Sequence, residues 1–163
     1  LALLEISDSR VVTSDTRSAV VISGATHGNE YLNIADRLSS AFIEDSSGLT
    51  SIADFLSSGG IIYVVPILNP DGYSSRRRSN ASGRDLNRDF HLDATNRPGF
   101  TQPETRELTE YLAQDLADSN ANLKLVMDYH CCADSTLYPW AYTRGPMDEP
   151  DLHRERNIYG LLL

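Results

Sequence analysis

A histidine and a glutamate stand three positions apart in the segment "ATHGNE", at His27 and Glu30. They follow the apolar run "SAVVIS", which is typical of a buried strand. Imidazole nitrogen and carboxylate oxygen are both ligands that zinc takes in proteins. A strand that ends here would deliver two metal ligands to the edge of a sheet, whereas a surface turn could contain both residues by chance.

A third candidate ligand lies much further along the chain. His130 follows another apolar run, "LKLVMDY". Because a catalytic zinc site takes three protein ligands and leaves one position for water, His27, Glu30 and His130 would make a suitable set. The competing interpretation places His27 in a turn and Glu30 at the solvated start of a helix, where the helix dipole favours an acid. The spacing alone does not decide between them.

These residues need a scaffold, and the hydrophobic pattern predicts one. Three apolar runs indicate strands: 18–25, 61–68 and 123–130, the first of them buried. Segments with helical periodicity lie between and after them, at 29–45, 50–58, 102–119 and 149–163. Strands that alternate with helices predict an α/β domain with a largely parallel sheet. Ligands bind beyond the carboxyl ends of strands in such sheets, which is where His27 and His130 stand.

Residues 69–100 show little periodicity and are rich in Asn, Asp, Gly, Pro and Arg. We expect a long irregular loop there, and loops of this length in compact domains usually have a function. The sequence Pro70-Asp71-Gly72 within it predicts a turn rather than catalytic groups.

Composition limits the possible functions. The 163 residues suffice for one domain with a core, and we treat 1–163 as a single domain. The net charge of −9 argues against a nucleic-acid partner, and no apolar run approaches membrane-spanning length. No basic segment leads to a cleavage site, so no signal peptide is predicted. The compartment is not determined by the sequence, and a cytoplasmic location is the default expectation.

Six motifs follow one another along the chain: "HGNE", "ILNPDGY", "GRDLNRDF", "QPETREL", "DYHCC" and "LYPW". Together they resemble the zinc carboxypeptidase family, the metallopeptidases related to carboxypeptidase A, over residues 18–142. The resemblance implies a mixed, largely parallel twisted sheet with helices on both faces. It also implies one zinc ion and hydrolysis of a peptide or amide bond next to a free C-terminal carboxylate.

The resemblance assigns three zinc ligands: His27, Glu30 and His130. Asp85 matches the acid that accepts a hydrogen bond from the first zinc histidine, since a ligating imidazole needs its other N–H anchored. Asn87 and Arg88 match the pair that binds the α-carboxylate of the substrate, a role that suits the planar guanidinium.

The resemblance also places an arginine beside the scissile carbonyl, where it would stabilise the oxyanion. The run Arg76, Arg77 and Arg78 occupies that part of the chain. Counting back from "DLNR", Arg78 matches best, and its two neighbours are interpreted as solvated residues or as part of the substrate rim.

The adjacent Cys131 and Cys132 follow a candidate ligand. Consecutive residues of a strand point to opposite faces, so both cannot join His130 at one ion. We expect them to be packing thiols.

The chain departs from the family towards its C-terminal end. The family's general base is a glutamate several tens of residues beyond the third ligand, but Leu163 lies only 33 residues after His130. Glu149 and Glu155 come too early to replace it. We therefore expect the N-terminal portion of a longer enzyme. A chain that ended here would instead be a non-catalytic, zinc-containing binding module.

The substrate stays open among three classes: that of a carboxypeptidase, that of a murein-peptide amidase and that of an aspartoacylase-like or succinylglutamate desuccinylase-like amidohydrolase. The stretch Ser74–Arg84 between "NPDGY" and "DLNR" is short, which resembles the bacterial murein-peptide amidase branch that cuts a γ-D-glutamyl bond to diaminopimelate. "THGNE" and "DLNR" also occur in the aspartoacylase and succinylglutamate desuccinylase branch. The expected partner is a peptide or peptidoglycan peptide with a free carboxylate.

Overall fold

The computed structural model describes residues 1–31, 50–90 and 99–132. The helix expected at 149–163, most of the helix expected at 29–45 and the motif "LYPW" lie outside these residues. The chain divides into two units, Leu1–Cys131 and Cys132–Leu163, and all the elements below belong to the first.

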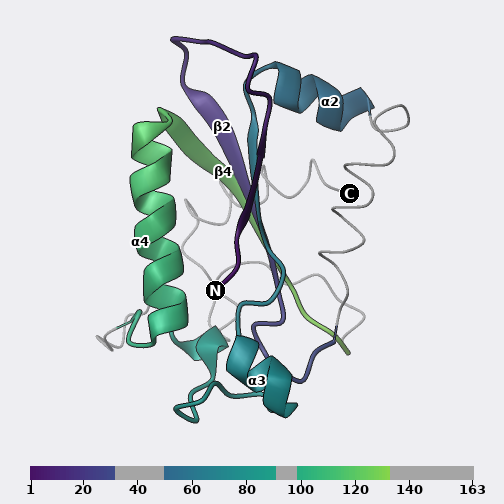
Figure 1. The fold of residues 1–163 in the computed structure, drawn as a ribbon, viewed down its shortest axis with the longest axis vertical. Coiled ribbons are helices and arrows are strands. Elements are labelled where there is room, and N and C mark those ends of the chain that lie inside the picture. The colour runs from purple at the N-terminus through teal and green to yellow at the C-terminus, as the bar shows by residue number, and fades with distance from the viewer. Residues whose placement is uncertain (32–49, 91–98, 133–163) are drawn as a thin grey trace, which may run out of the picture. The chain divides into compact units, whose positions relative to one another are not determined.

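A four-stranded sheet forms the centre of the first unit (Figure 1). Its strands lie in the order β1-β3-β2-β4, with the bounds Leu4–Ser7 for β1, Ile61–Val65 for β3, Arg17–Gly24 for β2 and Ala121–Tyr129 for β4. β2 pairs in parallel with both β3 and β4, whereas β1 pairs antiparallel with β3. The sheet is therefore mixed and largely parallel, as expected. β1 was not predicted, because its four residues are too few to show a period.

Helices cover both faces of the sheet (Figure 1). Successive residues of a strand point to opposite faces, so Val21 and Ile22 of β2 belong to different layers. On the side of Val21, α4 (Pro103–Asp118) packs through residues such as Leu112. On the side of Ile22, α2 (Thr50–Ser57) covers the sheet. Among the described residues, no helix is long and apolar enough to cross a membrane.

The segment that follows β3 contains a short helix rather than only a loop. α3 spans Pro70–Ser75, and the Asn69 side chain caps it by accepting a hydrogen bond from the N–H of Gly72 at 2.9 Å. Pro70 occupies the first turn, where a missing N–H costs nothing. The turn predicted at Pro70 to Gly72 was wrong, because an Asn cap followed by Pro starts a helix as readily as it starts a turn.

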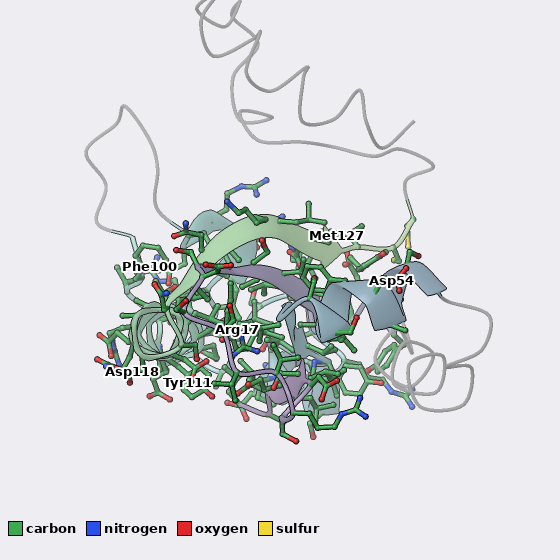
Figure 2. The ribbon with its side chains drawn as sticks, turned by 90° about the horizontal axis from the view of Figure 1, so that it is seen from above. Arg17, Asp54, Phe100, Tyr111, Asp118 and Met127 are labelled. Carbon is green, nitrogen blue, oxygen red and sulfur yellow. The ribbon has the colours of Figure 1, made fainter. Side chains whose placement is uncertain are left out.

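β4 lies at one edge of the described sheet, and this strand is exposed on much of its surface. Its apolar residues Leu123, Val126 and Met127 are all among the exposed side chains. Figure 2, seen from above, shows Met127 on this outer strand and α4 end-on beside the sheet. The carboxyl end of β4 nevertheless lies beside the end of β2, and this junction carries the candidate site.

Candidate metal centre

The sheet brings two of the predicted ligands together. β2 and β4 are parallel neighbours whose last paired residues are Gly24 and Tyr129. His27 lies in the turn after β2, and His130 directly follows β4. Both histidines therefore stand at the same sheet edge, beyond the carboxyl ends of the strands.

Glu30 lies between the two imidazole rings. Its Oε1 is 2.9 Å from Nδ1 of His27, and its Oε2 is 2.9 Å from Nδ1 of His130. The donor atoms of the three side chains all lie within 4.8 Å of one another, so the group could hold a metal ion. His27 and Glu30 are buried, whereas 30% of the His130 side chain is exposed. Of the three side chains, His130 is thus the most accessible to solvent.

Each imidazole uses its second nitrogen to contact a different carboxylate. Nε2 of His27 lies 3.1 Å from Oδ1 of Asp85, the contact that the family resemblance implied. Nε2 of His130 lies 2.9 Å from Oδ2 of Asp128. A proton on each Nε2 satisfies both carboxylates and leaves the Nδ1 lone pair of each histidine on the side of Glu30. The ring orientations therefore suit a metal ion bound through Nδ1.

Asp128 was not among the predicted site residues. A signal for it exists in the motif "DYH", because residues two apart on a strand share one face. The contact with His130 could have been inferred from that spacing. The partners that hold Asp128 in place could not, because they come from β2 and the turn after it.

Asp85 joins the metal group to the loop that carries the predicted substrate residues. Nε and Nη2 of Arg78 both donate to its Oδ2, at 3.1 and 3.0 Å. Its Oδ1 also accepts the N–H of Asn87 at 3.0 Å and so caps η1, a 3₁₀ turn spanning Leu86–Arg88. Asn87 and Arg88 lie within this turn and are exposed. The structure thus brings Arg78, Asn87 and Arg88 to the neighbourhood of the ligands, and the other arginines of the run are exposed on the same loop.

The carboxylates of the site are held in their ionised form. Burial by itself raises the pKa of Glu30, but in the metal-free site protonated Nδ1 groups of His27 and His130 would donate to its carboxylate and lower that pKa overall. Burial likewise raises the pKa of Asp85 and of Asp128. The hydrogen bonds from Arg78 bring the pKa of Asp85 below its usual value, and the hydrogen bond from His130 does the same for the pKa of Asp128. The hydrogen bond to Asp128 is the largest cause that raises the pKa of His130, to about 8.

The charges of the site suit a divalent cation. The site has three carboxylates, those of Glu30, Asp85 and Asp128, and one guanidinium, that of Arg78. When both imidazoles are neutral, two negative charges are left uncompensated around the two Nδ1 atoms. A dication bound there would balance them. Two imidazoles and one carboxylate are a ligand set that zinc takes in catalytic sites, so the residues present fit this metal.

The two cysteines do not contribute thiolates. Cys131 and Cys132 are both disulfide-bonded, so the expectation of packing thiols was wrong. The backbone N–H of Cys131 instead donates to Oε2 of Glu30 at 3.3 Å. The residue after His130 therefore helps to hold the carboxylate between the histidines.

A buried acid fixes the end of η1 against α4. Asp89 accepts hydrogen bonds from the N–H groups of Thr101 and Gln102 at 3.0 and 2.9 Å, and from the Thr105 hydroxyl. These N–H groups immediately precede α4, with Gln102 at its N-cap, so the carboxylate also lies near the positive end of that helix. Sequence reasoning did not assign Asp89 a role. Its contacts place Asn87 and Arg88 on a rigid support rather than on a free loop.

The turn that carries His27 and Glu30 packs closely against α3. A Cβ atom added to Gly28 would lie 2.1 Å from the backbone carbon of Gly72. The N–H of Gly28 also donates to the carbonyl of Arg78 at 3.3 Å. Only a residue without a side chain allows this approach, so the position of both ligands depends on Gly28.

We expect Gly28→Ala to destabilise the full-length protein. The new methyl group would meet backbone atoms, which cannot move aside as a flexible side chain can. The free energy of unfolding should fall by about 3 kcal/mol or more, the upper end of the usual cost of overpacking. Denaturant unfolding measures this, with Asn29→Ala at the exposed neighbouring position as the control. Equal stability of both variants would show that α3 does not restrict the turn.

Comparison with known proteins agrees with this geometry. The model of the family "Zinc carboxypeptidase" matches residues 1–160. Carboxypeptidase SOL1 of Arabidopsis thaliana is 30% identical over 145 residues, which cover 86% of this chain and 28% of that protein. Inactive metallocarboxypeptidase ECM14 of Paracoccidioides brasiliensis is 25% identical over 166 residues, covering 83% of this chain and 28% of that protein.

A solved structure shows the same fold. The carboxypeptidase A of Helicoverpa armigera superposes with a TM-score of 0.61 at 20% identity, over 80% of this chain and 37% of that chain. The chain thus spans well under half the length of these three proteins. Since the family model matches nearly all of the chain, the protein belongs to the zinc carboxypeptidase family.

Proposed function

We propose that this protein is a zinc-dependent metallocarboxypeptidase that hydrolyses a peptide or amide bond next to a free C-terminal carboxylate. The observation that carries the proposal is the convergence of His27, Glu30 and His130 within 4.8 Å. The carboxylate partners on both imidazoles add to it, because such anchors are typical of histidines that bind metal. Membership of the family supports the same conclusion.

The residues of the chain have distinct parts in this proposal. His27, Glu30 and His130 hold one zinc ion, which when bound supplies a Lewis acid and a water of lowered pKa. Asn87 and Arg88 bind the terminal carboxylate of the peptide, because the planar guanidinium meets a carboxylate through two N–H groups. Arg78 donates to the oxyanion that develops at the scissile carbonyl. In this proposal, no residue of 1–163 is assigned as the general base.

The terminal carboxylate gives a direct test in the full-length protein. We expect one zinc per chain and hydrolysis of peptides with a free C-terminus. Amidated versions of the same peptides should react much more slowly, because they lose the charge that Arg88 binds. Removal of zinc by a chelator should abolish hydrolysis, and added zinc should restore it. Absence of bound zinc, or equal rates on acid and amide, would refute the proposal.

A second candidate is a non-catalytic module that keeps zinc and binds peptide carboxylates without cleaving them. It is favoured by the matched relative that bears the name of an inactive metallocarboxypeptidase. The two functions differ in one measurement. A module of this kind would bind a peptide with a free carboxylate in the presence of zinc and leave it intact, as followed by mass spectrometry.

Three kinds of substrate would distinguish between the catalytic activities that the family resemblance leaves open. A carboxypeptidase should release the last residue of ordinary α-linked peptides. A murein-peptide amidase should instead cleave γ-D-glutamyl-diaminopimelate, and an enzyme like aspartoacylase or succinylglutamate desuccinylase should cleave an N-acyl amino acid. We expect the α-linked peptides to be the best substrates, and comparison of kcat/KM for the three classes decides.

A further inference from the structure

The carboxylate of Asp128 is held by groups from two segments that are far apart in the sequence. Its Oδ1 accepts the Ser23 hydroxyl at 2.8 Å and the Thr26 hydroxyl at 2.8 Å. Its Oδ2 lies 2.9 Å from both the Thr26 hydroxyl and Nε2 of His130. Ser23 ends β2 with Gly24, and both hydroxyl residues are buried. The carboxylate therefore has little freedom to turn away from the imidazole.

We propose that Asp128 is a positioning residue that holds His130 for metal binding. It accepts the proton on Nε2, so that the Nδ1 lone pair faces Glu30 and the metal position. This inference rests on the proposed function, because it requires that the site binds zinc. It goes beyond the family resemblance, which assigned an anchoring acid to the first zinc histidine alone.

The surroundings of Asp128 differ from those of Asp85 in charge. Asp85 forms an ion pair with Arg78. The positive guanidinium offsets much of the negative charge that Asp85 would otherwise present to His27. Asp128 receives only neutral hydroxyls besides His130 among the described residues. Its negative charge is thus directed at a single imidazole. A full negative charge there makes Nδ1 a stronger donor to a metal ion than a neutral amide would.

Competing with this is a purely structural role. Asp128 also links the end of β4 to the end of β2, and the hydroxyl contacts alone could explain its presence. The two roles make different predictions for Asp128→Asn. An amide keeps the shape and can still accept the Nε2 proton, but it carries no charge. A structural link would be largely preserved by Asn, whereas the electrostatic support of His130 would be lost.

The test is zinc affinity in the full-length protein, measured by competition with a chelator of known affinity. We expect Asp128→Asn and Asp128→Ala to weaken zinc binding by about 10- to 100-fold, the usual effect of removing such a partner. The visible absorption spectrum of the cobalt-substituted protein should also change, because it reports the ligand field at His130. Ser23→Ala should weaken zinc binding by a few-fold, since Thr26 still holds the carboxylate.

The matched control is Asp118→Asn, which removes the same charge from an exposed residue at the end of α4. Figure 2 shows Asp118 on the outer side of that helix. Its zinc affinity should equal that of the wild type. Asp85→Asn serves as the reference for an anchoring acid.

The outcomes separate this inference from the proposed function. Wild-type protein that binds no zinc refutes both. Wild-type protein that binds zinc, with Asp128 variants of the same affinity and the same cobalt spectrum, refutes only the inference. A lower free energy of unfolding of the metal-free Asp128→Ala protein with unchanged zinc affinity would assign Asp128 the structural role. If the Asp128 variants do not fold, Ser23→Ala decides, because unchanged affinity and cobalt spectrum in it overturn the inference.

Discussion

Glu30→Ala should abolish both metal binding and hydrolysis in the full-length protein. Among the described residues, Glu30 is the one side chain that contacts the Nδ1 atoms of both histidines, at 2.9 Å each. Its loss removes a ligand and the group that holds the two rings towards each other. Loss of an outer partner of a ligand costs about 10- to 100-fold in metal affinity. Removal of the ligand itself should therefore exceed the upper end of that range, and kcat/KM should fall to background.

Two further variants make this result specific. Glu30→Gln keeps the volume but offers a neutral oxygen, so it should bind zinc more weakly than the wild type and better than Glu30→Ala. Glu107→Gln removes one carboxylate from the exposed side of α4 and should change neither zinc content nor rate. Zinc is measured after dialysis by elemental analysis. Full zinc occupancy of Glu30→Ala would show that the ion is held elsewhere.

The second large effect concerns the different parts of Arg88 and Arg78. The carboxylate that Arg88 is proposed to bind carries the same charge in the ground and transition states. Arg88→Ala should therefore raise KM and affect kcat less. Arg78 is proposed to meet charge that develops only in the transition state. Its loss should lower kcat by roughly 10²- to 10³-fold.

The contact between Arg78 and Asp85 adds a condition to this experiment. Arg78 donates to Oδ2 of Asp85 through Nε and Nη2, at 3.1 and 3.0 Å. Arg78→Ala therefore also removes two hydrogen bonds from the carboxylate that anchors His27. Zinc content must accordingly be measured for the same variant. A low kcat with full zinc supports the oxyanion role. A low kcat that is restored by added zinc would mean that Arg78 acts through Asp85.

Amidated peptides complete the comparison. They lack the charge that Arg88 binds, so Arg88→Ala should have little further effect on them, whereas Arg78→Ala should still lower kcat. Arg106→Ala, at an exposed position of α4, is the control. If Arg88→Ala and Arg78→Ala raise KM alike and leave kcat unchanged on the acid substrate, the proposed division between them is wrong.

Much of the scaffold follows from local properties of the sequence. The apolar runs at 18–25, 61–68 and 123–130 became β2, β3 and β4, and the amphipathic run at 102–119 became α4. For β2 and β3 the prediction holds because burial on both faces requires an unbroken apolar strand, and for α4 because a helix with one buried face requires a helical period. β4 forms where predicted, although most of its residues are exposed among the described residues. The candidate ligands were found in the same way, from side-chain chemistry at the ends of strands.

Other features depend on contacts that no local pattern encodes. β1 forms because its backbone pairs with β3, although its own four residues show no period. α3 replaces the predicted turn because Asn69 turns its side chain back to cap Gly72. In each case the local sequence allowed two conformations, and a tertiary or capping contact selected one.

The sequence by itself determined which residue types are available to bind a metal and which strands carry them, because both follow from side-chain chemistry and hydrophobic period. Only the tertiary structure decided how those residues are oriented. The pairing of β2 with β4 places Ser23 beside Asp128 although 105 positions separate them, and the close contact of Gly28 with Gly72 fixes the turn that carries His27. Such orientation depends on distances between segments remote in the chain, and these distances are set only when the sheet is assembled.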